Sequence, residues 1–332
     1  YPLRRYRASD TLPSDWPLRP EDFPVEPYLD DCDRLFDLHE ACGGDFIWSA
    51  SAFWGVPWLE AALGCPIFAD HSTGSIHAQR PPGVAGPDSV PRFDADSPWM
   101  RLAAEFLDRM AARSRGRWPI GTTRMRGISD LLSALYGGTE FILAMLERPD
   151  EVKRVCRKLT DFWIAFGKLQ LARIPLFHGG VGSFYYNLWA PPGTVWHQED
   201  AAALLSPALY DEFVREHDDR IARAFDGCIM HQHPTKFAPT DFYLRMPFLA
   251  VELHVDEGGP SAEALHATHT KIMSRKPLVI WGNLSERDLD WVFRKLPHAG
   301  LAVITVVPSP ERAGEIWQRC FPSWPFQAMQ PL

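Results

Sequence analysis

Two histidines separated by a single residue end a short apolar run in this chain of 332 residues. The run 228–233 predicts a β-strand, and side chains two residues apart on a strand point to the same side. The imidazoles of His231 and His233 can therefore converge on one ion. Because histidine is the commonest metal ligand and suits Zn, Cu, Fe or Ni, we expect a metal site here.

The next predicted strand, 249–255, brings further acidic and imidazole groups. Its polar and apolar residues alternate, with Glu252, His254 and Asp256 set against Val251, Leu253 and Val255. We expect the apolar set to pack against helices and the polar set to face the site. Glu252 is the predicted third metal ligand, with an ion pair or a substrate hydrogen bond as its alternatives. His254 is the predicted proton donor or acceptor.

Other chemistry-bearing side chains lie near predicted strand ends elsewhere in the chain. His178 and Glu199 are predicted as further catalytic groups that supply or accept a proton. Glu199 could instead stabilise the start of the following helix through the helix dipole. The side chains that we expect to contact a substrate are Arg126, Tyr185, Tyr186, Trp189, His197 and Asn283.

Nucleophilic catalysis has little support in the sequence. The chain contains no Gly-x-Ser-x-Gly elbow, and Cys228 lies at the start of its predicted strand, which is the wrong end for an active site. The pair His266 and His269 lies among charged residues on a predicted helix, and a solvated helix face explains it better than a metal site does.

The second half of the sequence alternates strands with helices at regular intervals. Strands are predicted at 228–233, 249–255, 278–283 and 301–307, and helices follow from 240 and at 261–275, 285–295 and 309–320. Repeated strand–helix units predict a parallel sheet. Eight units would close a TIM barrel, whereas five or six would form an open doubly wound sheet. We prefer the barrel, because no Gly-x-Gly-x-x-Gly follows a strand.

The first half shows the same alternation less clearly. Strands are predicted at 45–51, 118–122 and 175–180, helices at 98–115, 129–136, 139–146 and 149–174, and a helix that begins at Ser206-Pro207. Residues 179–193 predict an aromatic, glycine-rich loop, and 196–200 a second loop. Residues 1–44 predict an irregular arm with a short helix near 32–38, and 45–325 form the predicted barrel, whose active site would lie at the carboxyl ends of its strands.

Composition narrows the class of protein. The net charge of −8 and the pI of about 5.8 argue against a nucleic-acid-binding protein. No apolar stretch is long enough to predict a membrane span, and the first residues show no signal peptide. The six cysteines form no C-x-x-C pair, so we expect a cytoplasmic protein with reduced thiols, which could be a homodimer.

Several short motifs, in their order, resemble the uroporphyrinogen decarboxylase superfamily, which includes cobalamin-dependent and coenzyme M methyltransferases. The matching segments, spread over roughly 100–325, lie at 119–131, 137–141, 148–152, 205–213, 231–233, 280–284 and 308–312. Among them are Gly137-Gly138-Thr139-Glu140-Phe141, Arg148-Pro149-Asp150-Glu151-Val152 and Ile280-Trp281-Gly282-Asn283-Leu284. The resemblance implies a TIM barrel.

The two branches of that superfamily imply different chemistry. The decarboxylases use no metal and carry an Arg-Gln-Ala-Gly-Arg stretch that is absent here. The methyltransferases bind zinc through His-x-Cys, a carboxylate and a late Cys. His231 matches the first ligand and Glu252, 21 residues later, matches the carboxylate, but His233 replaces the Cys and 304–309 contains none. Zn is the first expectation, but this harder donor set would hold Zn less selectively, so that Fe, Cu or Mn become plausible.

The resemblance therefore predicts a metal-dependent methyltransferase acting on a small methoxy or methylamine substrate, with a corrinoid protein that carries cobalamin as its methyl acceptor. The metal would polarise the substrate oxygen or nitrogen, and the aromatic residues 184–189 would wall the pocket. The alternative is decarboxylation, hydrolysis or oxidative cleavage of a small carboxylate. A third reading is a metal- or corrinoid-binding protein without catalytic activity.

Overall fold

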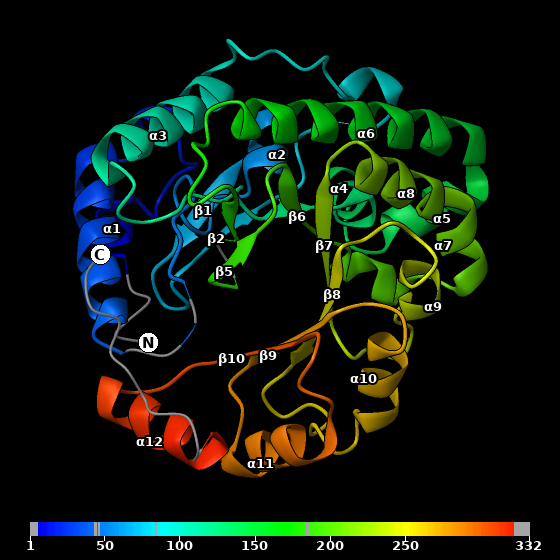
Figure 1. The fold of residues 1–332 in the computed structure, drawn as a ribbon. Helices are drawn as coiled ribbons and strands as arrows, with labels where there is room; N and C mark the ends of the chain where they lie inside the picture. The colour runs from blue at the N-terminus through cyan, green and yellow to red at the C-terminus, as the bar shows by residue number, and fades with distance from the viewer. Residues whose placement is uncertain (1–5, 43–44, 46, 84, 184–185, 322–332) are drawn as a thin grey trace.

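A six-stranded parallel sheet is the centre of the structure, a computed structural model that describes residues 6–42, 45, 47–83, 85–183 and 186–321 (Figure 1). Its strand order is β10-β9-β8-β7-β6-β3. The strands are β3 Met125–Arg126, β6 Thr194–Gln198, β7 Gly227–Gln232, β8 Ala250–Val255, β9 Leu278–Gly282 and β10 Leu301–Thr305. Every neighbouring pair is parallel, so all six carboxyl ends lie at one edge, and the predicted parallel α/β fold is confirmed.

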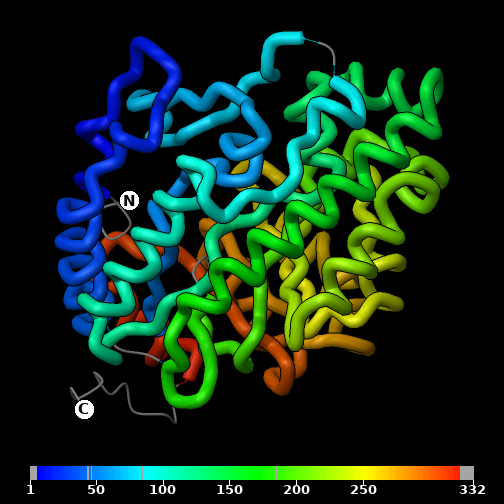
Figure 2. Tube along the Cα trace, turned by 90° about the horizontal axis from the view of Figure 1, so that it is seen from above, coloured from blue at the N-terminus to red at the C-terminus, as the bar shows by residue number. Residues whose placement is uncertain are grey.

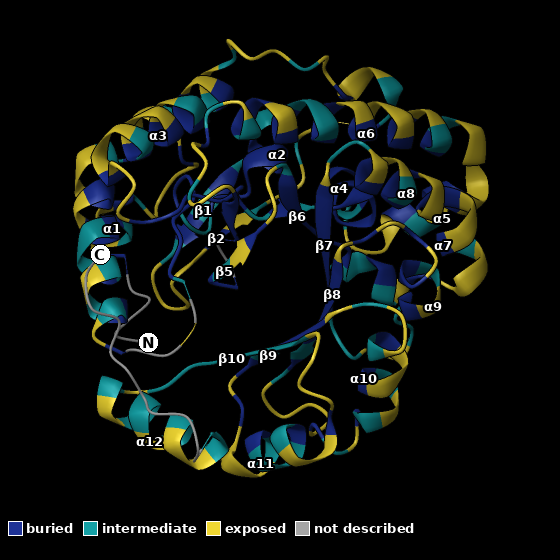
Figure 3. Cartoon of the chain, in the orientation of Figure 1, coloured by how far each residue is buried: buried dark blue, intermediate teal, exposed yellow. Residues whose placement is uncertain are grey.

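Helices surround the strands as an outer ring (Figure 1). They are α1 Val25–Glu40, α2 Trp58–Ala62, α3 Pro98–Ser114, α4 Ile128–Tyr136, α5 Glu140–Glu147, α6 Pro149–Leu171, α7 Pro207–Phe213, α8 Arg215–Arg223, α9 Thr240–Tyr243, α10 His266–Met273, α11 Glu286–Lys295 and α12 Pro310–Cys320. Two antiparallel hairpins complete the elements, β1 Ile67–Asp70 with β2 Ser75–Ala78 and β4 Val181–Ser183 with β5 Leu188–Ala190. The outer faces of the helices are exposed, whereas β6, β7 and most of β8 and β9 are buried (Figure 3).

Alternation along the strands separates two apolar layers. Val251, Leu253 and Val255 belong to the large core between sheet and helices, as predicted. The opposite face carries a smaller cluster with one or more residues from each of five strands: Trp196, Ile229, Ala250, Val279 and Ile304, joined by Tyr186. Strand side chains alternate with period two. Polar residues nearer the carboxyl ends of the strands therefore share the inner face with this apolar cluster and lie next to it.

Local capping explains where several helices begin. The Ser206 side chain accepts a hydrogen bond from the backbone of Leu209 at the start of α7, and Ser309 does the same for Arg312 in α12. At α11, Ser285 and Asp288 form a reciprocal capping box. The starts that were predicted at these serines are therefore confirmed, since a serine N-cap satisfies backbone donors whatever the tertiary context.

The N-terminal segment is more ordered than its composition suggests. In place of the short helix predicted near 32–38, α1 spans 16 residues and packs against α3 (Figure 2). Its buried residues Tyr28, Leu29, Cys32 and Leu35 recur at helical spacing, although acidic residues between them obscure the pattern. The Tyr28 hydroxyl donates a hydrogen bond to the carbonyl of Ser51, which ties this arm to the body of the protein.

Other sequence-based expectations were wrong in the first half. Within the described residues, the strands predicted at 45–51 and 118–122 are reduced to one bridge between Ala50 and Ile120, and 175–180 forms a turn. Conversely, 196–200 is not a loop, because Trp196, His197 and Gln198 are buried in β6. The polar residues of this buried strand hide the apolar pattern by which a strand is normally predicted. Among the described residues the six-stranded ladder ends at β3 and β10.

Over the described part of the chain, none of the helices combines the length and the apolar character that crossing a bilayer requires.

Candidate metal centre

The carboxyl end of β7 positions the two histidines that the sequence singled out. Nε2 of His231 lies 3.0 Å from Nε2 of His233. Each Nδ1 faces a carboxylate: His231 donates to Glu252, and His233 donates to Oδ1 of Asp256 at 2.7 Å. When Nδ1 carries the hydrogen, Nε2 of a neutral imidazole presents a lone pair. Two lone pairs that face each other at this distance require a proton or a metal ion between them.

Asp200 completes a three-membered donor set with this pair. Its Oδ1 lies 3.6 Å from Nε2 of His231 and 3.9 Å from Nε2 of His233. This oxygen is buried and has no hydrogen-bond partner, whereas Oδ2 accepts from Nε2 of Gln198 at 2.6 Å. Ligands about 2.0–2.2 Å from a tetrahedral ion stand roughly 3.3 Å apart. The observed separations of 3.0–3.9 Å therefore fit a site that could hold a divalent ion.

Glu252 lies behind His231, on the side away from His233. Register pairs the two residues across β7 and β8, and the Glu252 side chain is fully buried. Burial disfavours the charged form of each group, but their mutual attraction outweighs it. As a result the pKa of His231 is raised and the pKa of Glu252 is lowered. Such a carboxylate fixes the tautomer and the orientation of the imidazole.

His254 projects from β8 beside the pair. Its ring centroid lies 4.9 Å from that of His233 and 4.5 Å from that of Trp281. Nδ1 of His254 approaches Oε1 of Glu252 to 3.5 Å, and neither atom has a hydrogen-bond partner. We call the six residues His231, His233, His254, Asp200, Glu252 and Asp256 the histidine–carboxylate cluster.

Reciprocal hydrogen bonds hold Asp200 in place. Carboxylate oxygens of Asp130, on α4, accept from the backbone nitrogens of Asp200 at 3.3 Å and Ala201 at 2.8 Å. In return, Glu199 accepts from the backbone nitrogens of Ile128 at 2.5 Å and Ser129 at 2.8 Å, where α4 begins. Each acid thus satisfies the free donors that start the other element. Glu199 therefore stabilises the start of α4, which precedes it in the chain, and not the start of the following helix as the alternative had it.

A glycine is required where these elements meet. A Cβ at Gly127 would collide with Oε1 of Glu199 and lie 2.5 Å from the carbonyl oxygen of Gln198. We expect Gly127→Ala to lower the free energy of unfolding by about 1–3 kcal/mol, because Glu199 must move from its donors. Gly138→Ala is the matched control, since a Cβ there meets nothing within 4 Å. Equal stabilities of the two variants in urea denaturation would contradict this steric requirement.

His197 belongs to a second buried group on the opposite face of β6. Its Nε2 lies 2.9 Å from Oδ1 of Asp218, and the Tyr210 hydroxyl donates to the other oxygen of Asp218 at 2.6 Å. Burial lowers the pKa of His197 and raises that of Asp218 to about 7. This group lies between sheet and helices, so the structure does not bring His197 to the histidine–carboxylate cluster as expected for a substrate contact.

The remaining predicted site residues are scattered. His178 is exposed in a turn, and Trp189 on β5 donates to the carbonyl of Phe177. Arg126 is held by Glu60 at 3.3 Å and Asp130 at 3.7 Å. The position of Tyr185 lies outside the described residues.

Tyr186 and Asn283 have different environments. Tyr186 is fully buried in the inner apolar layer, where its hydroxyl accepts from Nε1 of Trp196. Asn283 is exposed directly after β9, at the edge of the sheet that carries the cluster.

Sequence reasoning did not assign Asp200 a role at the metal. A signal was present in the sequence, because Gln198 ends β6 opposite His231 and Asp200 follows two residues later. Because 196–200 was predicted as a loop, the strand register that places Asp200 near His231 was not available.

Comparisons with known proteins agree with the architecture. No family model and no curated protein matches the sequence. Among solved structures, the chain is similar to a methyltransferase from Methanosarcina mazei, with a TM-score of 0.63 and 14% sequence identity over 95% of this chain and 96% of that one. At this identity the likeness establishes a shared α/β fold over nearly the whole chain.

Proposed function

We propose that this protein is a metal-dependent enzyme that removes a methyl group from a small methoxy or methylamine substrate, within a closed TIM barrel. The observation that carries the proposal is the pair of facing Nε2 atoms of His231 and His233, with the unpartnered Oδ1 of Asp200 beside them. The shared fold with a methyltransferase is consistent with it.

The donor set fits a divalent ion. His231, His233 and Asp200 would hold it, and three protein ligands leave a position for substrate. When bound, such an ion supplies Lewis acidity toward a substrate oxygen or nitrogen. Two imidazoles and a carboxylate suit Zn, and they also suit Fe, Cu or Mn.

The other residues of the histidine–carboxylate cluster position these ligands and carry protons. Glu252 and Asp256 accept from the two Nδ1 atoms and so keep both Nε2 atoms turned inward. We assign Glu252 to this orienting role in place of the ligand role expected from sequence. His254, packed against Trp281 and with Nδ1 turned toward Glu252, would give a proton to the leaving oxygen or nitrogen or take one from it.

A second candidate has its own support in the ligand types. Two histidines and one carboxylate with open positions is the pattern of non-haem iron sites, and all six cysteines are absent from the described metal-binding groups. Decarboxylation, hydrolysis or oxidative cleavage of a small carboxylate is therefore the alternative activity. Consumption of oxygen by Fe-loaded protein would favour it.

Methyl transfer to a corrinoid tests the leading proposal. Protein stripped with EDTA and reloaded with Zn²⁺, Fe²⁺ or Mn²⁺ is mixed with methoxy or methylamine compounds and cob(I)alamin. We expect methylcobalamin, detected by its absorbance, only in metal-loaded samples. The proposal fails if no loaded sample transfers a methyl group, or if the stripped protein transfers it equally well. A corrinoid protein is the acceptor that we propose in the cell.

A further inference from the structure

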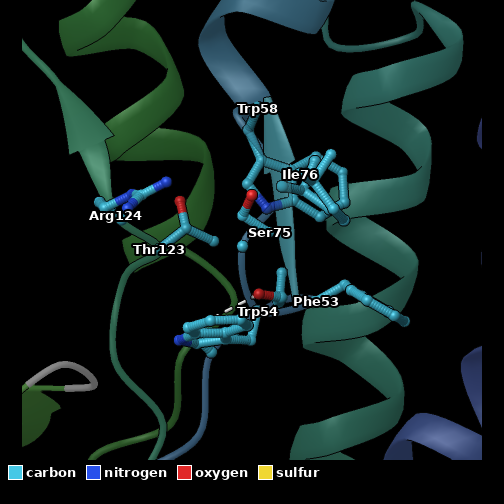
Figure 4. A pocket seen from close by; sticks show the side chains of 11 residues that line it. Phe53, Trp54, Trp58, Ser75, Ile76, Thr123 and Arg124 are labelled. Carbon is cyan, nitrogen blue, oxygen red and sulfur yellow. Dashed lines mark hydrogen bonds between the residues drawn. The ribbon is translucent and has the colours of Figure 1, made fainter. Parts of the chain in front are cut away.

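A small pocket with one cationic corner is lined by residues that follow the bridge at Ala50, by the β1–β2 hairpin and by the segment before β3 (Figure 4). Figure 4 shows Thr123 and Arg124 on one wall, Ser75 and Ile76 opposite, and Trp54 below. The remaining large lining residues, Phe53 and Trp58, are aromatic. Its volume of about 60 Å³ has room for roughly four or five water-sized groups, which limits any occupant to a small molecule or a small part of one.

The polar groups of this corner lack partners in the protein. Arg124 is half-buried and makes no hydrogen bond or ion pair within the described chain. The Oγ1 atom of Thr123 is buried and also has no partner, although the backbone nitrogen of the same residue is fixed by Gln170 at 2.8 Å. Buried polar atoms are normally satisfied. The Thr123 hydroxyl and the Arg124 guanidinium, both without partners on one wall, therefore indicate a ligand with hydrogen-bond acceptor atoms.

Thr123 and Arg124 directly precede β3 in the chain. Within β3, Arg126 pairs with Gln198 in the ladder with β6. Gln198 in turn orients Asp200.

We infer that Arg124 and Thr123 bind the carboxylate of a small monocarboxylic substrate, whose apolar part lies against Trp54, Phe53 and Ile76. One guanidinium and one hydroxyl in an otherwise apolar lining match a single negative charge. A phosphate would leave charge uncompensated there. The inference rests on the proposed function and narrows it, because the substrate would then present its methoxy or methylamine group to the metal and its carboxylate to Arg124.

Binding of paired probes tests this assignment without relying on turnover. Dissociation constants of acetate, propionate and their uncharged amides are measured by ligand-observed NMR in the presence of EDTA, so that carboxylates cannot bind through a metal. We expect each acid to bind at least about tenfold more tightly than its amide. Arg124→Gln should abolish this preference, and Arg124→Lys should retain part of it. Arg101→Gln, on the exposed face of α3, should leave it unchanged.

Several results would overturn the assignment. Equal binding of acid and amide by the unaltered protein, or an undiminished preference in Arg124→Gln, excludes a carboxylate at this corner. Tighter binding of methylphosphonate than of propionate would point to a phosphoryl ligand instead. Zn²⁺ affinity of Arg124→Gln separates the two proposals: it should equal that of the unaltered protein, and its loss would show that Arg124 acts on the metal site and not on substrate.

Discussion

Replacing both His231 and His233 with alanine is expected to weaken Zn²⁺ binding by at least about 1000-fold. Zinc sites with four protein ligands bind with about 10–16 kcal/mol at neutral pH, or roughly 3 kcal/mol for each ligand. The double variant removes two of three ligands from the proposed site. Titration of metal-free protein against a chelator of known affinity measures the loss.

The matched control removes another pair of histidines. His71→Ala/His77→Ala changes two exposed imidazoles near the β1–β2 hairpin and should leave Zn²⁺ affinity unchanged. Thermal unfolding supplies an independent readout, because an ion that binds only the folded state raises the midpoint. We expect Zn²⁺ to stabilise the control and not the His231→Ala/His233→Ala variant. If Zn²⁺ stabilised both double variants equally, His231 and His233 would not be metal ligands.

The second large effect separates the two carboxylates that could act as third ligand. We expect Asp200→Asn to weaken Zn²⁺ binding by more than about 100-fold, since its unpartnered oxygen faces both Nε2 atoms. Glu252→Gln should cost less, about 10–100-fold, as is typical of a group that orients a ligand. The same chelator competition measures both affinities.

The d–d spectrum of Co²⁺-loaded protein provides the qualitative check. Loss of an oxygen ligand in Asp200→Asn should change the coordination geometry and hence the spectrum, whereas Glu252→Gln should preserve it. The reverse order of effects would return Glu252 to the ligand role that the sequence predicted. Urea denaturation of both variants shows whether either loss of affinity reflects unfolding, because Glu252 is fully buried.

Strand alternation made part of the site predictable. His231 and His233, and likewise Glu252 and His254, share a face because side chains two apart on a strand always do so. Neighbouring parallel strands then place His231 opposite Glu252. The same regularity explains why the four strand–helix units of the second half were located correctly. Serine caps marked helix starts for an equally local reason.

The N-terminal half was harder to predict because its segments depend on distant partners. The segment 45–51 contributes a single bridge to Ile120, and β6 is a strand only because β3 and β7 flank it. Its polar residues are buried with partners from elsewhere, such as Asp218 for His197. Hydrophobic periodicity contains no information about such pairings.

By itself, the sequence determined the α/β alternation, the end of β7 as the site of the His231/His233 pair, and the inward face of β8, because each follows from spacing within one segment. Only the tertiary structure decided which atoms face which. It turned Glu252 to the back of His231, brought Asp200 to its front through the exchange of hydrogen bonds with α4, and moved His197 to the far side of the sheet. These outcomes depend on contacts between residues far apart in the chain, which a local pattern cannot specify.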